Sequence, residues 1–322
     1  MHFAAKMWPT RRRRRDSTYN RWKFRGAKRG QVDGLLLAIN DGEVIGQLGL
    51  IPVTARIGEG HYPCQWACDL MVDASVRRKG IGSLLLAKAM SRDVITLGSN
   101  PSAAADAVMA RLGFRSLMGP RLMVLPLQLS EVLSWKVPES LSRMIPLLSL
   151  MGQPLVMLRH RALAKAKPRV KAMSCKWQEV VHLIRKHQAT LTNPHVCHDL
   201  EFLQWRCSGL VNLSPELQAI KTESGGYAIV GPASPAFYVY DWSARDREEF
   251  LALFYLIYQM ARDAKIETIQ ALAQDESEES WLKTVNFLGL RRRYKIICYS
   301  AQQLVQWYQN FHYSLYDSDG NL

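Results

Sequence analysis

The chain has 322 residues, of which 48% are hydrophobic and 22% charged, a composition that is typical of folded globular proteins and excludes a largely disordered chain. Lys and Arg (42) outnumber Asp and Glu (28), so the formal net charge of +14 favours anionic partners: a nucleotide cofactor, nucleic acid, a phosphorylated substrate or an anionic lipid surface. No stretch is long and apolar enough to span a bilayer. Six scattered cysteines with no secretory signal before them predict reduced thiols in a cytoplasmic protein, at most peripheral to the inner face of the membrane.

The N-terminal segment, residues 1–18, is basic and contains an unbroken run of arginines from Arg11 to Arg15. Like charges in such a run repel one another, so we predict a flexible, solvated segment here in preference to a contact with nucleic acid or a membrane.

The first half of the chain alternates predicted strands and helices. Asn40-Asp41-Gly42 is a strong turn signal between two apolar runs and predicts a β-hairpin. The apolar residues of 81–90 recur at helical spacing, and Gly113 ends a second helical stretch. In chain order, the predicted elements are strands over 34–40, 44–51 and 65–72, a helix over 81–90, a strand over 94–97, a helix over 103–112 and a strand over 121–127.

The second half repeats the first weakly. Residues 202–207 resemble residues 19–24, with Trp-Arg in place of Trp-Lys. Asp69 and Asp241 each lie near the end of a predicted strand, and another strand begins 25 residues later in both copies (94−69 and 266−241). Leu112-Gly113-Phe114-Arg115 is matched by Leu288-Gly289-Leu290-Arg291. Because the matches keep the same order, we predict tandem copies of one mixed α/β fold, over 19–130 and 173–322.

Between the two copies, residues 131–172 read as a linker that is first apolar and then basic. Residues 144–158 are apolar but short, and they carry two prolines. We predict that this stretch is buried between the two halves. The alternative is that the apolar piece and the basic piece beside it sit on an anionic membrane surface.

The strongest chemical signal is the loop after the strand over 65–72, with the sequence Arg77-Arg78-Lys79-Gly80-Ile81-Gly82. A strand ends, a basic loop with two glycines follows, and a helix begins. Glycines let backbone amides approach a ligand closely, and amides at a helix N-terminus bind phosphate oxygens. The loop lacks the Gly-Lys-Ser/Thr ending of a Walker A motif and the triple-glycine spacing of a dinucleotide fingerprint. It therefore suits a pyrophosphate in another context.

This loop resembles that of the GNAT acetyltransferase superfamily, whose members carry Arg/Gln-x-x-Gly-x-Gly/Ala after a strand. Arg77, Gly80 and Gly82 match that pattern, as does the valine Val72, whereas Ala74 replaces a common proline. Asn100 and then Gly113-Phe114 follow in the order that is common in such families. The resemblance covers residues 19–127 well and the remainder only through the weak repeat.

The resemblance implies acetyl-CoA, or another short acyl-CoA, as co-substrate. The loop amides would hold its pyrophosphate, and the strand before the loop would pair with the pantetheine arm where the sheet splays open. The residues expected to bind CoA are Leu70, Met71, Val72, Arg77, Arg78, Lys79, Gly80, Ile81, Gly82 and Ser83.

Direct attack by an amine requires a group that takes its proton. Asp69 is the first candidate, because it lies on the strand before the loop; a structural carboxylate is the alternative. His61 is the second candidate, although it lies beside Gly60 in an expected turn. Asn100 is a further candidate. Many relatives carry a tyrosine, as acid for the thiolate, where this chain has Met109. Solvent or another group such as Tyr62 would then take that role, or the site is not catalytic.

The second copy departs further from the pattern. No glycine pair follows Asp241, so we predict that this copy has lost CoA binding. The spacings of His195, Cys197 and His198, and of Cys64 and Cys68, are irregular, and no metal site is predicted.

The sequence thus predicts an N-acyltransferase that moves an acetyl or short acyl group from CoA to a primary amine. The tandem layout resembles acetyltransferases of exopolysaccharide clusters, which suggests an amino-sugar acceptor. Two alternatives remain. One is a Fem-like aminoacyl transferase that uses charged tRNA; the other is a non-catalytic protein that binds CoA or a membrane surface.

Overall fold

The computed structural model describes residues 2–7, 16–25, 34–128, 133, 140, 144–166, 168–207, 217–233, 235–302 and 308–318. The arginine run at 11–15 lies outside the described residues. The chain forms two compact units that interleave along the sequence. Unit 1 comprises residues 1–119, 190–214 and 294–322, and unit 2 comprises residues 120–189 and 215–293. The predicted mixed α/β class is confirmed, with both parallel and antiparallel strand pairs in each unit.

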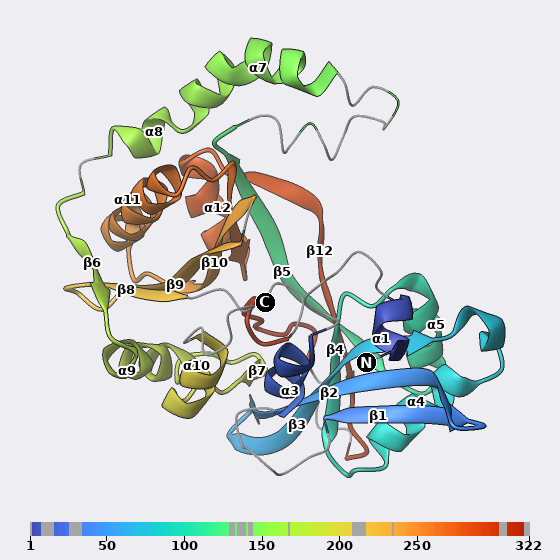
Figure 1. Cartoon of the computed structure of the whole chain (residues 1–322). Coiled ribbons are helices and arrows are strands. Elements are labelled where there is room, and N and C mark those ends of the chain that lie inside the picture. Colours follow the sequence, from blue (N-terminus) through green and yellow to red (C-terminus); the bar gives the residue numbers. More distant parts are fainter. Residues whose placement is uncertain are drawn as a thin grey trace. The chain divides into compact units, whose positions relative to one another are not determined.

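Unit 1 is built on the antiparallel strands β1 (Leu35–Asn40), β2 (Glu43–Ile57) and β3 (Gly60–Val72), followed by β4 (Ile95–Ser99), which pairs in parallel with β3 (Figure 1). The end of β12 (Leu288–Tyr299) pairs with β4, and β7 (His195–Val196) pairs with β2. Its helices are α1 (His2–Met7), α3 (Ser17–Arg25), α4 (Ile81–Met90), α5 (Ala103–Arg111) and α10 (Leu200–Cys207), with a 3₁₀ turn, η1 (Ala74–Val76).

Unit 2 contains the strands β6 (Ala172–Cys175), β8 (Gln218–Thr222), β9 (Tyr227–Ala233), β10 (Ala236–Ser243) and β11 (Thr268–Ala273), and β11 pairs with the second part of β5 (Arg115–Pro126). Its helices are α7 (Ile145–Arg159), α8 (Arg161–Ala164), α9 (Trp177–Gln188), α11 (Arg247–Asp263) and α12 (Glu276–Thr284). Among the described residues, no helix has the length and apolar character needed to cross a membrane.

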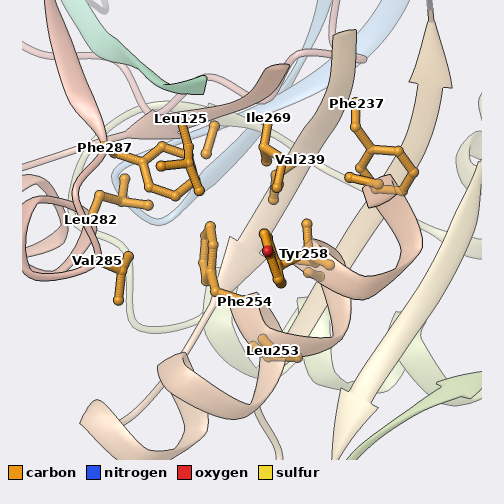
Figure 2. Close-up of a cluster of buried hydrophobic side chains, with 14 of the residues drawn as sticks. Leu125, Phe237, Val239, Leu253, Phe254, Tyr258, Ile269, Leu282, Val285 and Phe287 are labelled. Carbon is orange, nitrogen blue, oxygen red and sulfur yellow. The ribbon is translucent and has the colours of Figure 1, made fainter. Parts of the chain in front are cut away.

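Each unit has its own apolar core. In unit 1, α4 and α5 bury Leu85, Leu86 and Met109 against β2. In unit 2, α11 is amphipathic, and Figure 2 shows Phe254 and Tyr258 of this helix pointing toward Val239 and Ile269 of the strands. A core of this kind follows from apolar residues at helical spacing on one face of a helix and on one face of a sheet.

The expected domain boundaries at 130 and 173 differ from this division. Residues 190–214 and 294–322, expected in the second copy, belong to unit 1. The physical reason is long-range packing. Ile297 of β12 lies in the core of unit 1, and the rings of Phe311 and Tyr313 lie 6.0 and 5.8 Å from the ring of Trp66.

Candidate functional site

Strands β3 and β4 separate part of the way along their length. Their parallel register consists of three pairs, Cys64–Ile95, Gln65–Thr96 and Trp66–Leu97. Beyond Trp66, β3 continues to Val72, paired on its other edge with β2. β4 instead pairs with β12, Ser99 lying opposite Ile296. Within the described residues, no strand pairs with the β4-side edge of residues 70–72, so backbone donors and acceptors of these three residues can pair with an extended ligand.

A β-bulge shapes this open edge at Asp69. The register of β3 on β2 shifts between Gln47 and Gly49, and Asp69 takes a left-handed φ of 49°. Lys23 Nζ of α3 donates to Asp69 Oδ2 at 2.5 Å, and both side chains are almost entirely buried. A Cβ at Gly49 would lie 2.2 Å from the ring of Phe24, so this glycine lets α3 approach the bulge closely.

The loop after β3 ends at the N-terminus of α4. Asp73 begins the loop by capping η1, accepting from the Ser75 amide at 3.1 Å. A hydrogen bond from Lys6 and the Ser75 contacts lower the pKa of Asp73 to about 2. Gly80 is the N-cap of α4, with a φ of 83° and no side chain to cap the helix. The first amides of a helix have no partner inside it, so those at the start of α4 have the geometry that suits an anion.

The two glycines of the loop differ in whether the fold itself requires glycine at their position. The left-handed φ at Gly80 favours glycine by itself. Gly82 has an ordinary helical position, and a Cβ there would meet only Val72 and Leu70 atoms, at 3.8 and 3.9 Å. Packing therefore does not require glycine at 82. The exposed Arg77, Arg78 and Lys79 supply positive charge beside it.

Comparison with known proteins supports this geometry. Residues 2–114, about a third of the chain, match the model of the acetyltransferase (GNAT) family. A GCN5-related N-acetyltransferase from Kribbella flavida superposes with a TM-score of 0.55 at 12% identity, covering 81% of this chain and 59% of that one. Another from Anabaena variabilis gives 0.56 at 9%, covering 82% and 62%. The fold is that of the GNAT acyltransferases.

Saccharomyces cerevisiae N-myristoyltransferase with bound myristoyl-CoA has the same fold, with a TM-score of 0.52 at 13% identity, over 80% of this chain and 67% of that one. The present chain spans about three-fifths of the length of the two bacterial structures. No curated protein sequence matches it.

The structure brings most of the predicted residues to one edge of the GNAT fold. Asp69, Leu70, Met71 and Val72 line the open strand, and 77–83 form the loop at its end. Asn100 follows β4 at this same edge. Its backbone amide donates to the Lys295 carbonyl and its side-chain oxygen accepts from the Lys295 amide, each at 2.8 Å. That side-chain oxygen is therefore engaged in extending the β4–β12 pairing.

Two candidates lie elsewhere. Tyr62 is near the start of β3, seven residues before Asp69, which corresponds to about 23 Å along a strand. It lines a different cavity of about 260 Å³ with Met90 and Tyr299, so it cannot protonate a thiolate held near the bulge. His61 is exposed beside it. Met109, at the position where relatives carry tyrosine, is buried in the core of unit 1.

Lys23 is the residue that sequence reasoning missed, although the repeated Trp-Lys and Trp-Arg pairs were its signal. Trp22 Nε1 of α3 donates to the Trp205 carbonyl of α10 at 2.8 Å, and Trp205 Nε1 donates to the Trp22 carbonyl at 3.0 Å. Arg206, the counterpart of Lys23, is buried and donates to the carbonyls of Tyr316 and Ser318. The weak repeat is thus a pair of helices joined by reciprocal hydrogen bonds.

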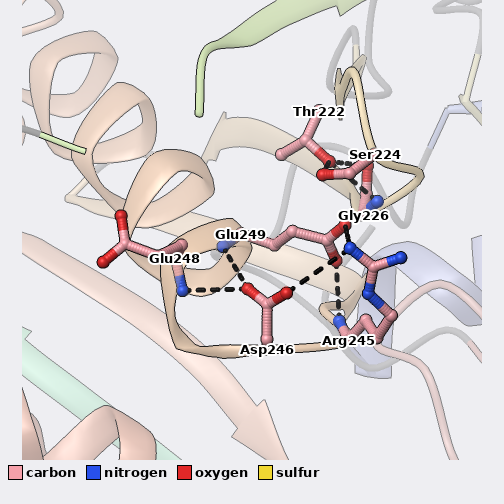
Figure 3. Close-up of polar contacts among 7 residues, drawn as sticks. All are labelled: Thr222, Ser224, Gly226, Arg245, Asp246, Glu248 and Glu249. Carbon is pink, nitrogen blue, oxygen red and sulfur yellow. Dashed lines mark hydrogen bonds and ion pairs between the residues drawn. The ribbon is translucent and has the colours of Figure 1, made fainter. Parts of the chain in front are cut away.

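Unit 2 also contains a parallel strand pair beside a register shift, and carboxylates cap the helix that follows it. β10 pairs in parallel with β11 from Ala236–Thr268 to Val239–Ala271, and the register on β9 shifts before Asp241. At the start of α11, Asp246 Oδ1 accepts from the amides of Glu248 and Glu249, and Glu249 Oε2 accepts from the Arg245 amide (Figure 3). Carboxylates thus occupy the amides that a phosphate would need.

Proposed function

We propose that this protein is an N-acyltransferase that transfers an acyl group from a CoA thioester to a primary amine. The carrying observation is the open edge of β3, which leads directly to a basic glycine loop at an uncapped helix N-terminus. An extended pantetheine arm ending in a pyrophosphate matches that succession of a strand edge and an anion site. The GNAT family match over 2–114 covers all of these residues.

The residues would bind the co-substrate in sequence. The amides of Arg78, Gly80, Ile81, Gly82 and Ser83 would hold the pyrophosphate, with the cations of 77–79 around it. The backbone of Leu70, Met71 and Val72 would pair with the pantetheine arm and place the thioester carbonyl near the bulge. We propose acetyl-CoA, or another short acyl-CoA, as the donor.

At the bulge, the chemistry requires proton transfers. The amine nitrogen attacks the carbonyl carbon of the thioester, and the carbon–sulfur bond then breaks to release CoA thiolate. Asp69 is the carboxylate nearest to the bulge and is the proposed proton acceptor, directly or through water. Lys23 holds the Asp69 carboxylate in place at the bulge through their ion pair. Solvent would protonate the thiolate, since Met109 replaces the tyrosine of relatives.

The acceptor we propose is an amino sugar, by the resemblance of the sequence layout to acetyltransferases of polysaccharide biosynthesis. Unit 2 would be a degenerate GNAT domain without CoA of its own, because Asp246 and Glu249 fill its anion site and Trp242 Nε1 bridges β10 to the Leu272 carbonyl at 2.8 Å.

Calorimetric titration with acetyl-CoA tests the proposal. Gly80→Asp puts a carboxylate at the anion site, and we expect it to weaken binding at least tenfold, or about 1.4 kcal/mol. Gly42→Asp is the matched control, because Gly42 has a φ of 79° and, like Gly80, has nothing within 4 Å of an added Cβ. If both variants bound acetyl-CoA with equal affinity, the loop would not be part of the binding site.

Turnover with a panel of amines is the second measurement. Acyl transfer that Gly80→Asp abolishes and Gly42→Asp retains supports the enzyme. CoA binding without turnover on any amine would favour a non-catalytic CoA-binding protein. No binding by the folded wild-type chain would overturn the proposal.

A further inference from the structure

Helix α7 has its apolar face turned outward. Six large apolar side chains of α7 and of the residue before it are exposed. Leu150 and Met151 are the most exposed of them, at 74% and 72%. The six are Met144, Leu148, Leu150, Met151, Met157 and Leu158. This contradicts the expectation that residues 144–158 form a buried linker. A helix on a protein surface ordinarily shows the opposite distribution, with polar residues toward water.

The inward face of α7 is fixed by specific contacts. Val156 is buried, and Gln153 Nε2 donates to the Leu127 carbonyl at 3.0 Å. His160, at the end of the helix, contacts the Tyr258 hydroxyl at 2.7 Å through Nδ1. Gly152 and Ser149 are also partly buried. Ser149, Gly152, Gln153 and Val156 therefore lie on the side of the helix that faces the protein, and hydrogen bonds at two points hold the orientation that exposes the large apolar side chains.

The chain around α7 is strongly cationic. Residues 140–178 contain eight Lys and Arg and no Asp or Glu. Arg161, Lys165, Arg169 and Lys171, which follow α7, are exposed. An exposed apolar helix of 15 residues, about 22 Å long, therefore lies directly beside a cluster of positive charge.

We propose that α7 and the basic segment after it (residues 161–171) dock this protein on an anionic lipid bilayer. The helix would lie in the plane of the interface, its apolar side chains among the acyl chains, while the cations contact lipid phosphates. The charge favours this occupant. A second copy or a protein partner would need only a matching apolar face, whereas an anionic bilayer accounts for both the apolar face and the absence of acidic residues. The proposal does not depend on acyl transfer.

Flotation with lipid vesicles tests this surface. The full-length wild type should bind vesicles of phosphatidylcholine with about a third phosphatidylglycerol, bind pure phosphatidylcholine much less, and lose binding as salt rises. Leu150→Ser/Met151→Ser should weaken binding at least tenfold. Ile39→Ser/Leu37→Ser, on the exposed strand β1, is the matched control and should bind like wild type.

The charge arm removes two cations. Arg161→Gln/Lys165→Gln should reduce affinity by about fivefold per charge and flatten the salt dependence. Lys88→Gln/Arg111→Gln removes two exposed cations of unit 1 and should have little effect.

Three results would overturn the proposal. The first is failure of the folded wild type to bind anionic vesicles. The second is binding that the α7 variants do not weaken. The third is a lipid-free dimer, seen by light scattering, that Leu150→Ser/Met151→Ser converts to monomer, because a second copy would then cover the face.

Discussion

Lys23 and Asp69 form an ion pair from which solvent is almost excluded, with side chains 1% and 2% exposed. A buried ammonium and a buried carboxylate stabilise each other, but either charge destabilises the folded protein if its partner is removed. The pair joins α3 to the bulge of β3, so it holds the strand in the conformation that opens its edge.

At this pair we predict an asymmetric effect of substitution. Lys23→Met should lower the free energy of unfolding by about 3–5 kcal/mol, because it removes the ammonium partner of a buried carboxylate. Lys23→Met/Asp69→Leu, which removes both charges, should regain most of that loss. Urea denaturation of the variants measures both effects. A loss below about 1 kcal/mol for Lys23→Met would show that the pair is solvated.

The same variants separate the two roles of Asp69. Removing Lys23 raises the pKa of a carboxylate that it had stabilised. If Asp69 takes the proton, the acid limb of the pH–rate profile moves to higher pH in Lys23→Met. A structural Asp69 would leave that limb in place and change only stability.

The place of the loop between a strand and a helix was predictable, because it follows an apolar strand pattern and precedes a helical pattern. Its two glycines and three cations predict an anion site there, and that remains a prediction. The partner of Asp69 was not predictable, because Lys23 lies 46 residues away and is brought there by long-range packing, including that of Phe24 on Gly49. Tyr62 failed for a related reason: the strand extends from 60 to 72, which moves this residue to the far end.

At the scale of elements, the first turn of α12 contains a glutamate, Glu278, with a shifted pKa. Asp275 caps the helix by accepting from the Glu278 amide at 2.9 Å, and Glu278 Oε2 accepts from the Gln274 amide at 2.8 Å. Burial raises the pKa of Glu278 to about 8, and the charges of Asp275 and Asp241 add to this effect. The raised pKa favours the protonated side chain in the folded protein.

This helix start predicts a pH dependence of stability. Between the unfolded value of 4.5 and about 8, unfolding releases the proton of Glu278, so its contribution is complete below that window and is lost as pH rises through it. Glu278→Gln keeps the acceptor without the charge. Its Tm should therefore fall less than that of wild type from pH 5.5 to 8.5. Melting curves that stay parallel over this range would contradict the prediction.

The elements themselves were largely predictable in the first half. Strands and helices over 34–127 occur in the predicted order, and the strands are longer than expected because β2 and β3 pair along their full length. The exposure of the apolar side chains of α7 was not predictable from the sequence. Composition says that a segment avoids water, but it does not say whether protein or another apolar phase covers it.

At the scale of the whole molecule, the units interleave, so a fragment that ends early lacks part of the core of unit 1. The core of unit 1 includes Ile297, and Trp66 packs against Phe311 and Tyr313 from the end of the chain. His198 of the middle segment contacts Asp317 at 2.5 Å, both side chains being buried. Sequence reasoning could not place these segments, because each contact joins residues more than a hundred positions apart.

A fragment of residues 1–130, although it holds the entire family match, should not fold alone. We expect it to lack a cooperative thermal transition and to bind no acetyl-CoA, whereas the full chain does both. Circular dichroism and calorimetry measure this. Adding residues 190–214 and 294–322 through linkers should restore a transition. If the 1–130 fragment were stable and unfolded cooperatively, the later segments would not be required for unit 1 to fold.

The return of the chain end to Trp66 also sets the order in which the protein can mature. A ribosome that has made residue 119 must add some 175 more residues before β12 emerges, which takes roughly ten to forty seconds at ordinary elongation rates. Throughout that time the nascent glycine loop would sit on an unfinished sheet. Interrupted products of translation would therefore remain inert toward nucleotides, and they would expose apolar strands that chaperones and proteases recognise.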